Sequence, residues 1–513
     1  MTFDSGAGGR TAAALLSTLV MAGACLPVAL FRLVDGDEGI FLAAVRLVGE
    51  GRALYHDFHF PQMPVVPYLY AAWMKLVGLG WYEGRLLSAV LAIGVGMLLH
   101  GHVASATRRP WLAFGATAAL ASSALFFAWF PAVKTYAAGG LFAFAAYVIL
   151  EARPRRWTPF VVGLLLGMGA STRLYLGALA PVFAGAIGSR APSRRAGWRQ
   201  MGAFGAGLVL AFAPVAFMAA ADVDTFLFNV VGYHGLRTAG GYLGDVTGRV
   251  TPLRWALDPT GPEGATAFQF SLLALATLAV VAVTLRAQRR PPLSAAAAGV
   301  LMVVSLAPSP SYAQYFCLLV PFLVAHLAVG FERLPAGRAR RGLGISLAVA
   351  LVAQVAVAPI EARRFLVTGW NVPGILGPSD VPNWRLPVVL AVGAAVDQAV
   401  PSDAGPSVMS FWPGYFVETR ATIAPRFENP FSLFYSSRMS DAEAGRRGFP
   451  IWPELAVGLA SSRWPVVVFG NSPHSRKPQR DLRGYLLRGG YVLVRRVADA
   501  EIYAAQAPPG GSQ

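Results

Sequence analysis

The sequence predicts an α-helical polytopic membrane protein that crosses the bilayer about eleven times and ends in a soluble α/β domain. Three observations predict this fold class. Only 13% of the 513 residues are charged, whereas a soluble domain carries roughly 25% charged residues. Apolar runs recur from the N-terminus to residue 359 and then stop. The arginines gather in short clusters between these runs, as they do in cytoplasmic loops.

Each apolar run predicts one membrane span, because about 20 apolar residues cross a hydrocarbon core of roughly 30 Å. The runs lie at 12–31, 85–104, 111–130, 135–150, 158–171, 174–188, 202–221, 267–285, 293–308, 313–331 and 342–359. The pair at 158–188 is irregular, because Ser171-Thr172-Arg173 interrupts it. This stretch is short for two spans and long for one. The arginine-rich loops alternate in side only if it crosses twice, so we predict a broken pair.

The arginine clusters predict the orientation of the chain. They lie in alternate loops, at 108–109, 153–156, 190–199, 286–290 and 333–341. The positive-inside rule then places the N-terminus in the cytoplasm and the C-terminal domain outside it, in a multi-pass protein of the cytoplasmic membrane. These loops and their attraction to anionic lipids explain the net charge of +17, so we expect membrane lipids and no nucleic acid as partners.

A change in composition predicts two domains. Residues 1–359 form the membrane domain, with two long loops outside the cytoplasm at 32–84 and 222–266. Residues 360–513 alternate apolar strands with helical stretches, which predicts a small extracytoplasmic α/β domain. The strands are expected at 407–411, 465–469, 491–494 and 501–504, and the helices at about 387–399, 452–462 and 479–488.

One acidic segment follows the first span directly. Asp35, Asp37 and Glu38 place three carboxylates within four residues at the membrane exit. A solvated loop that ends a helix explains them equally well on composition alone. The alternative is a base or a metal site at the membrane surface, since a carboxylate can take a proton from an acceptor hydroxyl.

Further short motifs follow the acidic segment in a fixed order. They are Asp37-Glu38, the segments 51–58, 61–64 and 68–71, Gly84-Arg85-Leu86-Leu87-Ser88, and Pro308 to Tyr315 with Pro321 after it. Their order and spacing over about 1–359 resemble the GT-C superfamily of membrane glycosyltransferases. That superfamily includes the dolichyl-phosphate-mannose–protein mannosyltransferases and the lipid A aminoarabinose transferases.

The resemblance implies an inverting glycosyltransferase that moves a hexose or a pentose from a polyprenyl-phosphate donor to an acceptor on the outer face of the cytoplasmic membrane. It assigns the catalytic base to Asp37, with Glu38 as its neighbour. Asp35 and Asp37 form the D-x-D pattern with which some members hold a divalent ion, so Mg²⁺ or Mn²⁺ is one expectation. Many relatives need no metal, and Lys134 stands where many carry a second acidic residue, so the metal requirement stays open. The acceptor also stays open between protein, lipid and polysaccharide.

A donor phosphate needs cations and hydroxyls at the outer membrane face. The candidates for binding it are Arg85, Lys134, Tyr136, Arg173, Tyr312 and Tyr315. His234 and Arg237 lie in the second long loop and are candidates for contact with the acceptor or the donor, but a loop of this length is equally compatible with a lid. Interfacial anchoring and an aromatic belt explain most of them singly. Arg173 is the stronger candidate, because it interrupts an apolar run, where a charge needs a partner.

Two other functions are compatible with these patterns. A transporter or lipid flippase would also need intramembrane charges and broken helices, but it would place polar residues at mid-bilayer, whereas here they gather at the outer span ends. A non-catalytic relative would act as a scaffold for an envelope assembly through the soluble domain. The intact Asp37-Glu38 pair argues against that scaffold role.

Overall fold

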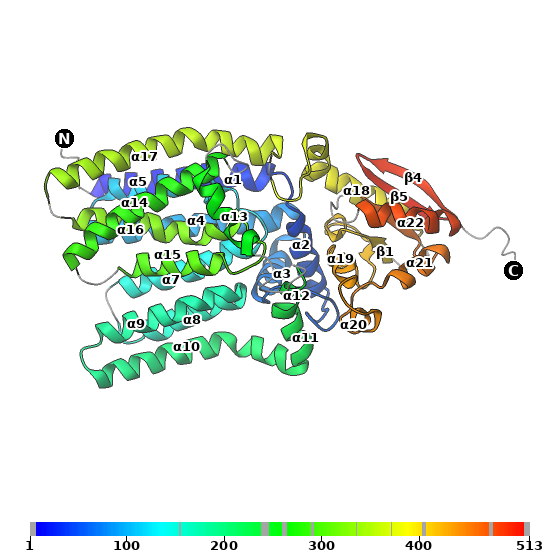
Figure 1. Cartoon of the computed structure of the whole chain (residues 1–513), viewed down its shortest axis with the longest axis horizontal. Helices are drawn as coiled ribbons and strands as arrows, with labels where there is room; N and C mark the ends of the chain where they lie inside the picture. Colours follow the sequence, from blue (N-terminus) through cyan, green and yellow to red (C-terminus); the bar gives the residue numbers. More distant parts are fainter. Residues whose placement is uncertain are drawn as a thin grey trace.

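The chain forms a helical bundle followed by a small α/β domain, which confirms the predicted fold class (Figure 1). The computed structural model describes residues 7–152, 155–237, 246–258, 264–288, 292–334, 336–370, 372–402, 407–470 and 476–506. The predicted arginine clusters at 153–156 and 286–290 lie partly outside these residues.

The bundle helices lie side by side with their axes nearly parallel (Figure 1). They are α1 (Ala7–Phe31), α4 (Trp81–Thr107), α5 (Pro110–Ala121), α7 (Thr135–Glu151), α8 (Thr158–Thr172), α9 (Ala180–Arg190), α10 (Arg194–Ala221), α14 (Gly264–Gln288), α15 (Leu293–Ser305), α16 (Val320–Arg333) and α17 (Arg338–Arg363). In the described part of the chain, 6 helices are long and apolar enough to cross a membrane alone. The other bundle helices are shorter, so the count of eleven spans stays a prediction.

Small residues let two bundle helices, α8 and α10, approach each other at the backbone. A Cβ atom at Gly163 would lie 2.0 Å from the carbonyl oxygen of Phe204. A Cβ atom at Gly207 would lie 2.1 Å from the carbonyl oxygen of Phe160. Van der Waals contact between such small residues is how helices associate where lipid removes the hydrophobic driving force.

Two helices of the bundle are interrupted at the end that faces the soluble domain. Arg173 follows α8 in an extended conformation, and the 3₁₀ helix η1 (Leu174–Leu179) then leads into α9. The 3₁₀ helix η4 (Ala313–Leu319) leads into α16 in the same way. Pro181 and Pro321 stand in the first turns of α9 and α16, where proline is tolerated because its missing N–H has no helical partner anyway.

Short helices lie between the bundle and the soluble domain (Figure 1). They are α2 (Gly36–Gly49), α3 (Val65–Val77), α11 (Val223–Leu227), the π-helix η2 (Phe228–Gly232) and α12 (Tyr233–Gly235). All of them belong to the two long loops that were predicted outside the cytoplasm.

The soluble domain contains a five-stranded sheet of order β2-β1-β3-β5-β4. Its strands are β1 (Ser407–Ser410), β2 (Thr422–Ile423), β3 (Val466–Phe469), β4 (Tyr491–Val497) and β5 (Ala500–Ala505). β1 pairs in parallel with β2 and β3, whereas β5 runs antiparallel to β3 and β4. The helices are α18 (Leu386–Ala399), α19 (Ser432–Ser436), α20 (Asp441–Arg446), α21 (Trp452–Ala460) and α22 (Arg476–Arg488). The two-residue strand β2 is the one that the sequence did not predict.

Candidate active site

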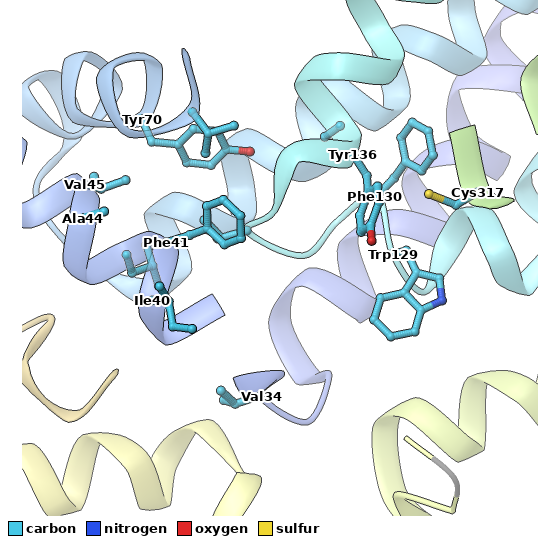
Figure 2. Close-up of a cluster of buried hydrophobic side chains, with 14 of the residues drawn as sticks. Val34, Ile40, Phe41, Ala44, Val45, Tyr70, Trp129, Phe130, Tyr136 and Cys317 are labelled. Atoms are coloured by element: carbon cyan, nitrogen blue, oxygen red, sulfur yellow. The ribbon is translucent and has the colours of Figure 1, made fainter. Parts of the chain in front are cut away.

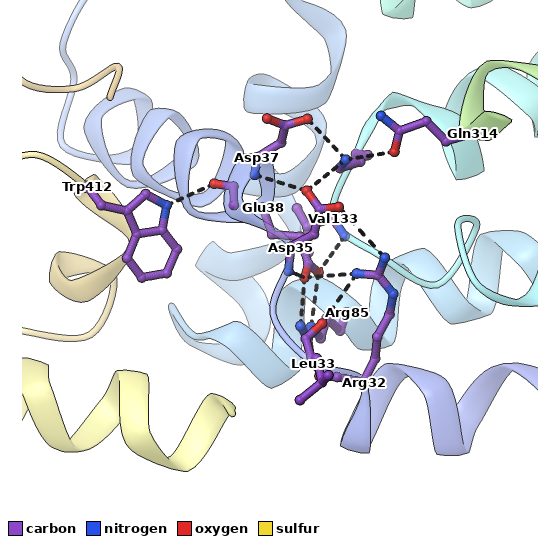
Figure 3. Close-up of polar contacts among 11 residues, drawn as sticks. Arg32, Leu33, Asp35, Asp37, Glu38, Arg85, Val133, Gln314 and Trp412 are labelled. Carbon is purple, nitrogen blue, oxygen red and sulfur yellow. Dashed lines mark hydrogen bonds and ion pairs between the residues drawn. The ribbon is translucent and has the colours of Figure 1, made fainter. Parts of the chain in front are cut away.

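A capping box starts α2 and separates the two adjacent carboxylates. The Asp35 side chain accepts a hydrogen bond from the Asp37 backbone N–H at 3.0 Å, and the Glu38 side chain accepts one from the Asp35 N–H at 3.0 Å. This reciprocal pattern fixes the first turn of the helix. Glu38 therefore turns back toward the bundle, and Asp37 is left on the other side of the turn (Figure 3).

Glu38 lies in a buried ion pair. Arg85 donates from Nε to Glu38 Oε1 at 3.0 Å and from Nη2 to Oε2 at 2.6 Å, and the Val133 N–H also donates to Oε1. Burial raises the pKa of Glu38, but Arg85 and Arg32 outweigh it and lower that pKa to about 2. The side chains of Glu38 and Arg85 are 0% and 1% exposed. The structure thus places Arg85, a predicted substrate-binding residue, on Glu38 and away from the accessible surface.

Asp37 is the accessible member of the acidic segment, with 43% of its side chain exposed. Lys134 Nζ lies 3.0 Å from Asp37 Oδ2 and 2.8 Å from Asp35 Oδ1, and it donates to Gln314 Oε1 at 3.2 Å (Figure 3). Partial burial raises the pKa of the Asp37 carboxyl, but the Lys134 ammonium and two nearby arginines outweigh burial and hold that pKa below its usual value. Asp37 is therefore an ionised carboxylate at neutral pH.

The guanidinium of Arg173 lies within a cage of three tyrosines. Its central carbon is 4.9 Å from the ring of Tyr136, 4.6 Å from that of Tyr175 and 4.9 Å from that of Tyr315. Nη1 donates to Thr135 Oγ1 at 2.8 Å. Among the residues that the structure describes, Nε of Arg173 is buried without a hydrogen-bond partner.

Arg237 brings a second guanidinium to the same place. It donates to the Tyr315 hydroxyl at 3.2 Å and lies over the ring of Tyr312 at 5.6 Å. The charges of Arg237 and Arg173 both lower the pKa of Asp37. The structure thus gathers five of the predicted site residues around Asp37: Lys134, Arg173, Arg237, Tyr312 and Tyr315.

Two predicted substrate-binding residues have other partners. Tyr136 is 1% exposed and packs near Phe130 and Cys317, so that its ring supports Arg173 from within the bundle (Figure 2). His234 donates from Nε2 to the carbonyl oxygen of Pro61 at 3.1 Å. Burial and the nearby arginines lower the pKa of His234 to about 4, so it is neutral at physiological pH.

The soluble domain also contacts α2. Trp412 Nε1 donates to the carbonyl oxygen of Gly36 at 2.9 Å, one residue before Asp37 (Figure 3). A Cβ atom at Gly39 would lie 2.7 Å from the Trp412 ring and 2.8 Å from Cα of Gly414, so only glycine permits this approach. Further along α2, Arg46 donates to two carbonyl oxygens of the domain, those of Phe416 and Ala421.

Sequence reasoning missed several residues of this site. Gln314 lies inside a motif that was singled out, and Tyr175 stands two residues after Arg173, so both were within reach of the sequence. The sequence did not mark Trp412 as a site residue, because a tryptophan in a soluble domain is ordinarily part of its hydrophobic core.

The acidic pair does not present an open metal site. Lys134 Nζ bridges the carboxylates of Asp35 and Asp37, the two predicted metal ligands. Within the described part of the chain, no group of three or more His, Cys, Asp or Glu side chains could hold a metal ion. A divalent ion at this position would have to displace a buried ammonium.

No protein-family model matches the sequence, and no curated protein matches it. Solved structures do share its fold. ArnT from Cupriavidus metallidurans bound to undecaprenyl phosphate aligns with a TM-score of 0.63 at 14% identity, over 99% of this chain and 100% of that chain. The arabinofuranosyltransferase AftD from Mycobacteria aligns with a TM-score of 0.54 at 17% identity, over 99% of this chain and 40% of that chain. The chain therefore has the GT-C fold, as its motifs predicted.

Proposed function

We propose that this protein is a membrane glycosyltransferase that transfers a sugar from a polyprenyl phosphate to an acceptor hydroxyl, with Asp37 as the base. One observation carries the proposal: an accessible carboxylate stands within a cluster of three cations, Lys134, Arg173 and Arg237. The GT-C fold supports it, since ArnT binds undecaprenyl phosphate in its crystal structure and AftD is an arabinofuranosyltransferase.

Arg173 and Arg237 are suited to hold the donor phosphate. The buried Nε–H of Arg173 has no acceptor among the described residues. A buried donor without an acceptor costs roughly 1–3 kcal/mol, and a phosphate oxygen would remove that cost. Arg237 donates to the hydroxyl of Tyr315, one of the tyrosines around Arg173. Its guanidinium is therefore placed to bind the same phosphate. Two fixed cations also stabilise the negative charge that grows on the phosphate as it leaves.

The transfer is a single displacement. The acceptor oxygen forms a bond to the anomeric carbon while the bond from that carbon to the phosphate oxygen breaks, and the electron pair leaves with the polyprenyl phosphate. Asp37 takes the proton of the acceptor hydroxyl, which requires an ionised and accessible carboxylate. Attack from the face opposite to the phosphate inverts the configuration of the sugar. Glu38 has a structural role here, since it is buried on Arg85.

We place the reaction at the outer face of the cytoplasmic membrane. The soluble domain and the start of α1 lie at opposite ends of the bundle (Figure 1). The cation cluster lies at the domain's end, because Lys134 contacts Asp37 in α2, which itself contacts the domain. The positive-inside rule puts the arginine-rich loops in the cytoplasm. Acceptor and donor headgroup would therefore meet outside, where the acceptor is a protein, lipid or polysaccharide of the cell envelope.

Binding of undecaprenyl phosphate to the full chain in detergent, followed by native mass spectrometry, tests the proposal. The parent protein should bind one lipid. Arg173→Ala should weaken binding at least about tenfold, because a hydrogen bond to a charged group contributes roughly 1.5–3 kcal/mol. Arg195→Ala removes an exposed arginine at the other end of the bundle and is the matched control. Equal affinity of the Arg173 variant and the parent would refute the proposed phosphate site.

A further inference from the structure

We propose that the ammonium of Lys134 is a built-in cation of this active site, so that the protein works without Mg²⁺ or Mn²⁺. The inference rests on the proposed function, because it assigns the electrostatic role of a metal in that reaction to a side chain. It concerns the acidic pair Asp35 and Asp37, whose D-x-D spacing predicted a metal site.

The Lys134 ammonium makes two hydrogen bonds, to Asp37 and Gln314, and an ion pair with Asp35. Nζ lies 2.8 Å from Asp35 Oδ1, 3.0 Å from Asp37 Oδ2 and 3.2 Å from Gln314 Oε1. Three protein oxygens therefore surround the ammonium, which has three hydrogens to donate. Oxygen ligands of Mg²⁺ or Ca²⁺ lie at roughly 2.0–2.6 Å, so the spacing of this site fits an ammonium.

The Lys134 side chain is held rigidly in this position. It is 3% exposed, and Nζ lies over the ring of Trp129 at 5.1 Å. The loop that carries it is tied down as well, since the Val133 N–H donates to Glu38 at 3.1 Å and the Lys134 N–H donates to the Ala132 carbonyl at 2.8 Å. The ammonium cannot leave this position without depriving two carboxylates of their partner.

The charges around the acidic segment balance without a metal. The three carboxylates face three cations among the described residues, namely Asp35, Asp37 and Glu38 against Arg32, Arg85 and Lys134. A divalent ion beside Lys134 would leave two excess charges in a largely buried site, where unpaired charge is costly. Arg173 and Arg237 form none of these ion pairs, so their charges are available to the donor phosphate.

This arrangement gives Lys134 a role different from that of the two arginines. Three protein oxygens already surround its ammonium, so we assign Lys134 to holding Asp37 in place and ionised, and not to the phosphate. Lys134 is in this sense a positioning residue for the base.

Manganese binding by the full chain in detergent tests the inference, with electron paramagnetic resonance of Mn²⁺ as the readout. The parent should show no saturable Mn²⁺ site, and EDTA should leave its affinity for undecaprenyl phosphate unchanged. Lys134→Ala should gain a saturable Mn²⁺ site. Its affinity should exceed any residual Mn²⁺ binding of the parent at least about tenfold, because a like charge a few ångströms away has been removed. Adding Asp35→Asn to that variant should abolish the gain.

A saturable Mn²⁺ site in the parent that disappears in Asp35→Asn would overturn the inference, as would a Lys134→Ala protein that folds and gains no site. If Lys134→Ala does not fold, Lys134→Gln removes the charge with less change in size, and the parent measurement decides by itself. Undecaprenyl phosphate binding is a separate readout. Its failure in the parent would refute the proposed function and leave the manganese result interpretable.

Discussion

Asp37 and Glu38 are neighbours in the chain, yet they meet different environments. The capping box turns Glu38 onto Arg85 inside the bundle and leaves Asp37 beside Lys134 at an accessible surface. One helix start thus gives adjacent carboxylates two environments, a buried ion pair for Glu38 and an accessible surface for Asp37, the proposed base. Substitution at each position should separate these roles.

Asp37→Asn should lower turnover by a factor of about 10² to 10⁴, the usual contribution of one positioned base. Asparagine keeps the size of the side chain but cannot accept the proton. Affinity for undecaprenyl phosphate should stay within a few-fold of the parent, because the arginines hold the phosphate. Transfer assays with a lipid-linked sugar and purified protein measure the first quantity, and native mass spectrometry measures the second. A turnover within a few-fold of the parent would move the base assignment away from Asp37.

Glu38→Gln should instead destabilise the protein. Breaking a buried ion pair costs roughly 3–5 kcal/mol, because the partner charge is left unpaired. The pKa of Glu38 is about 2 in the folded protein, below the value of roughly 4.3 of an unperturbed glutamate. Its stabilising effect is therefore complete above about pH 4.3 and is lost as the pH falls through about 2. Melting curves in detergent between pH 7 and pH 3 should show a steeper loss for the parent than for Glu38→Gln; parallel losses would contradict this.

At the scale of elements, α2 is held between the helical bundle and the soluble domain. Its first turn faces Lys134 and Arg85 on the bundle side and Trp412 on the side of the soluble domain. The ring of Trp412 also lies 6.1 Å from that of Trp81, over which the Arg85 guanidinium lies at 5.9 Å. The soluble domain thereby helps to fix the helix that carries the proposed base.

Trp412→Phe tests this clamp, because it keeps an aromatic ring and removes the Nε1–H that Gly36 accepts. Turnover should fall roughly two- to tenfold, the effect of one neutral hydrogen bond, while the KM for the lipid-linked sugar stays unchanged. Hydrogen exchange of the α2 amides should speed up. Trp452, a partly exposed tryptophan of α21, provides the matched control as Trp452→Phe. An unchanged turnover, or an equal loss in the control, would argue against the clamp.

The sequence predicted the helical elements far better than the contacts between them. Apolar runs marked the bundle helices, and Arg173 marked the break before η1, because span length and the cost of a buried charge act locally. The capping box of Asp35 and Glu38 was readable in principle from the spacing of those residues. The contact of Trp412 with Gly36 was not, since it joins residues 376 positions apart.

At the scale of the whole molecule, the proposed active site occupies one end of the bundle. The proposed base comes from the first long loop, Lys134 from the loop before α7, Arg237 from the second long loop, and Trp412 from the soluble domain. Arg438 in the domain also donates to the carbonyl oxygen of Leu236, next to Arg237. These parts of the site all belong to the loops and the domain that the positive-inside rule places outside the cytoplasm.

Cysteine labelling tests that placement, since the native Cys25 and Cys317 are both buried and should stay unlabelled. Ser461→Cys puts a thiol on the exposed surface of the soluble domain, and Ser189→Cys puts one at the exposed end of α9, beside an arginine-rich loop. In intact cells a membrane-impermeant maleimide should label the Ser461 variant and not the Ser189 variant, because only the domain should face outward. Permeabilising the membrane should then allow labelling of both, which shows that both thiols are reactive. The reverse pattern in intact cells would invert the topology and place the cation cluster, and with it the proposed transfer, on the cytoplasmic face.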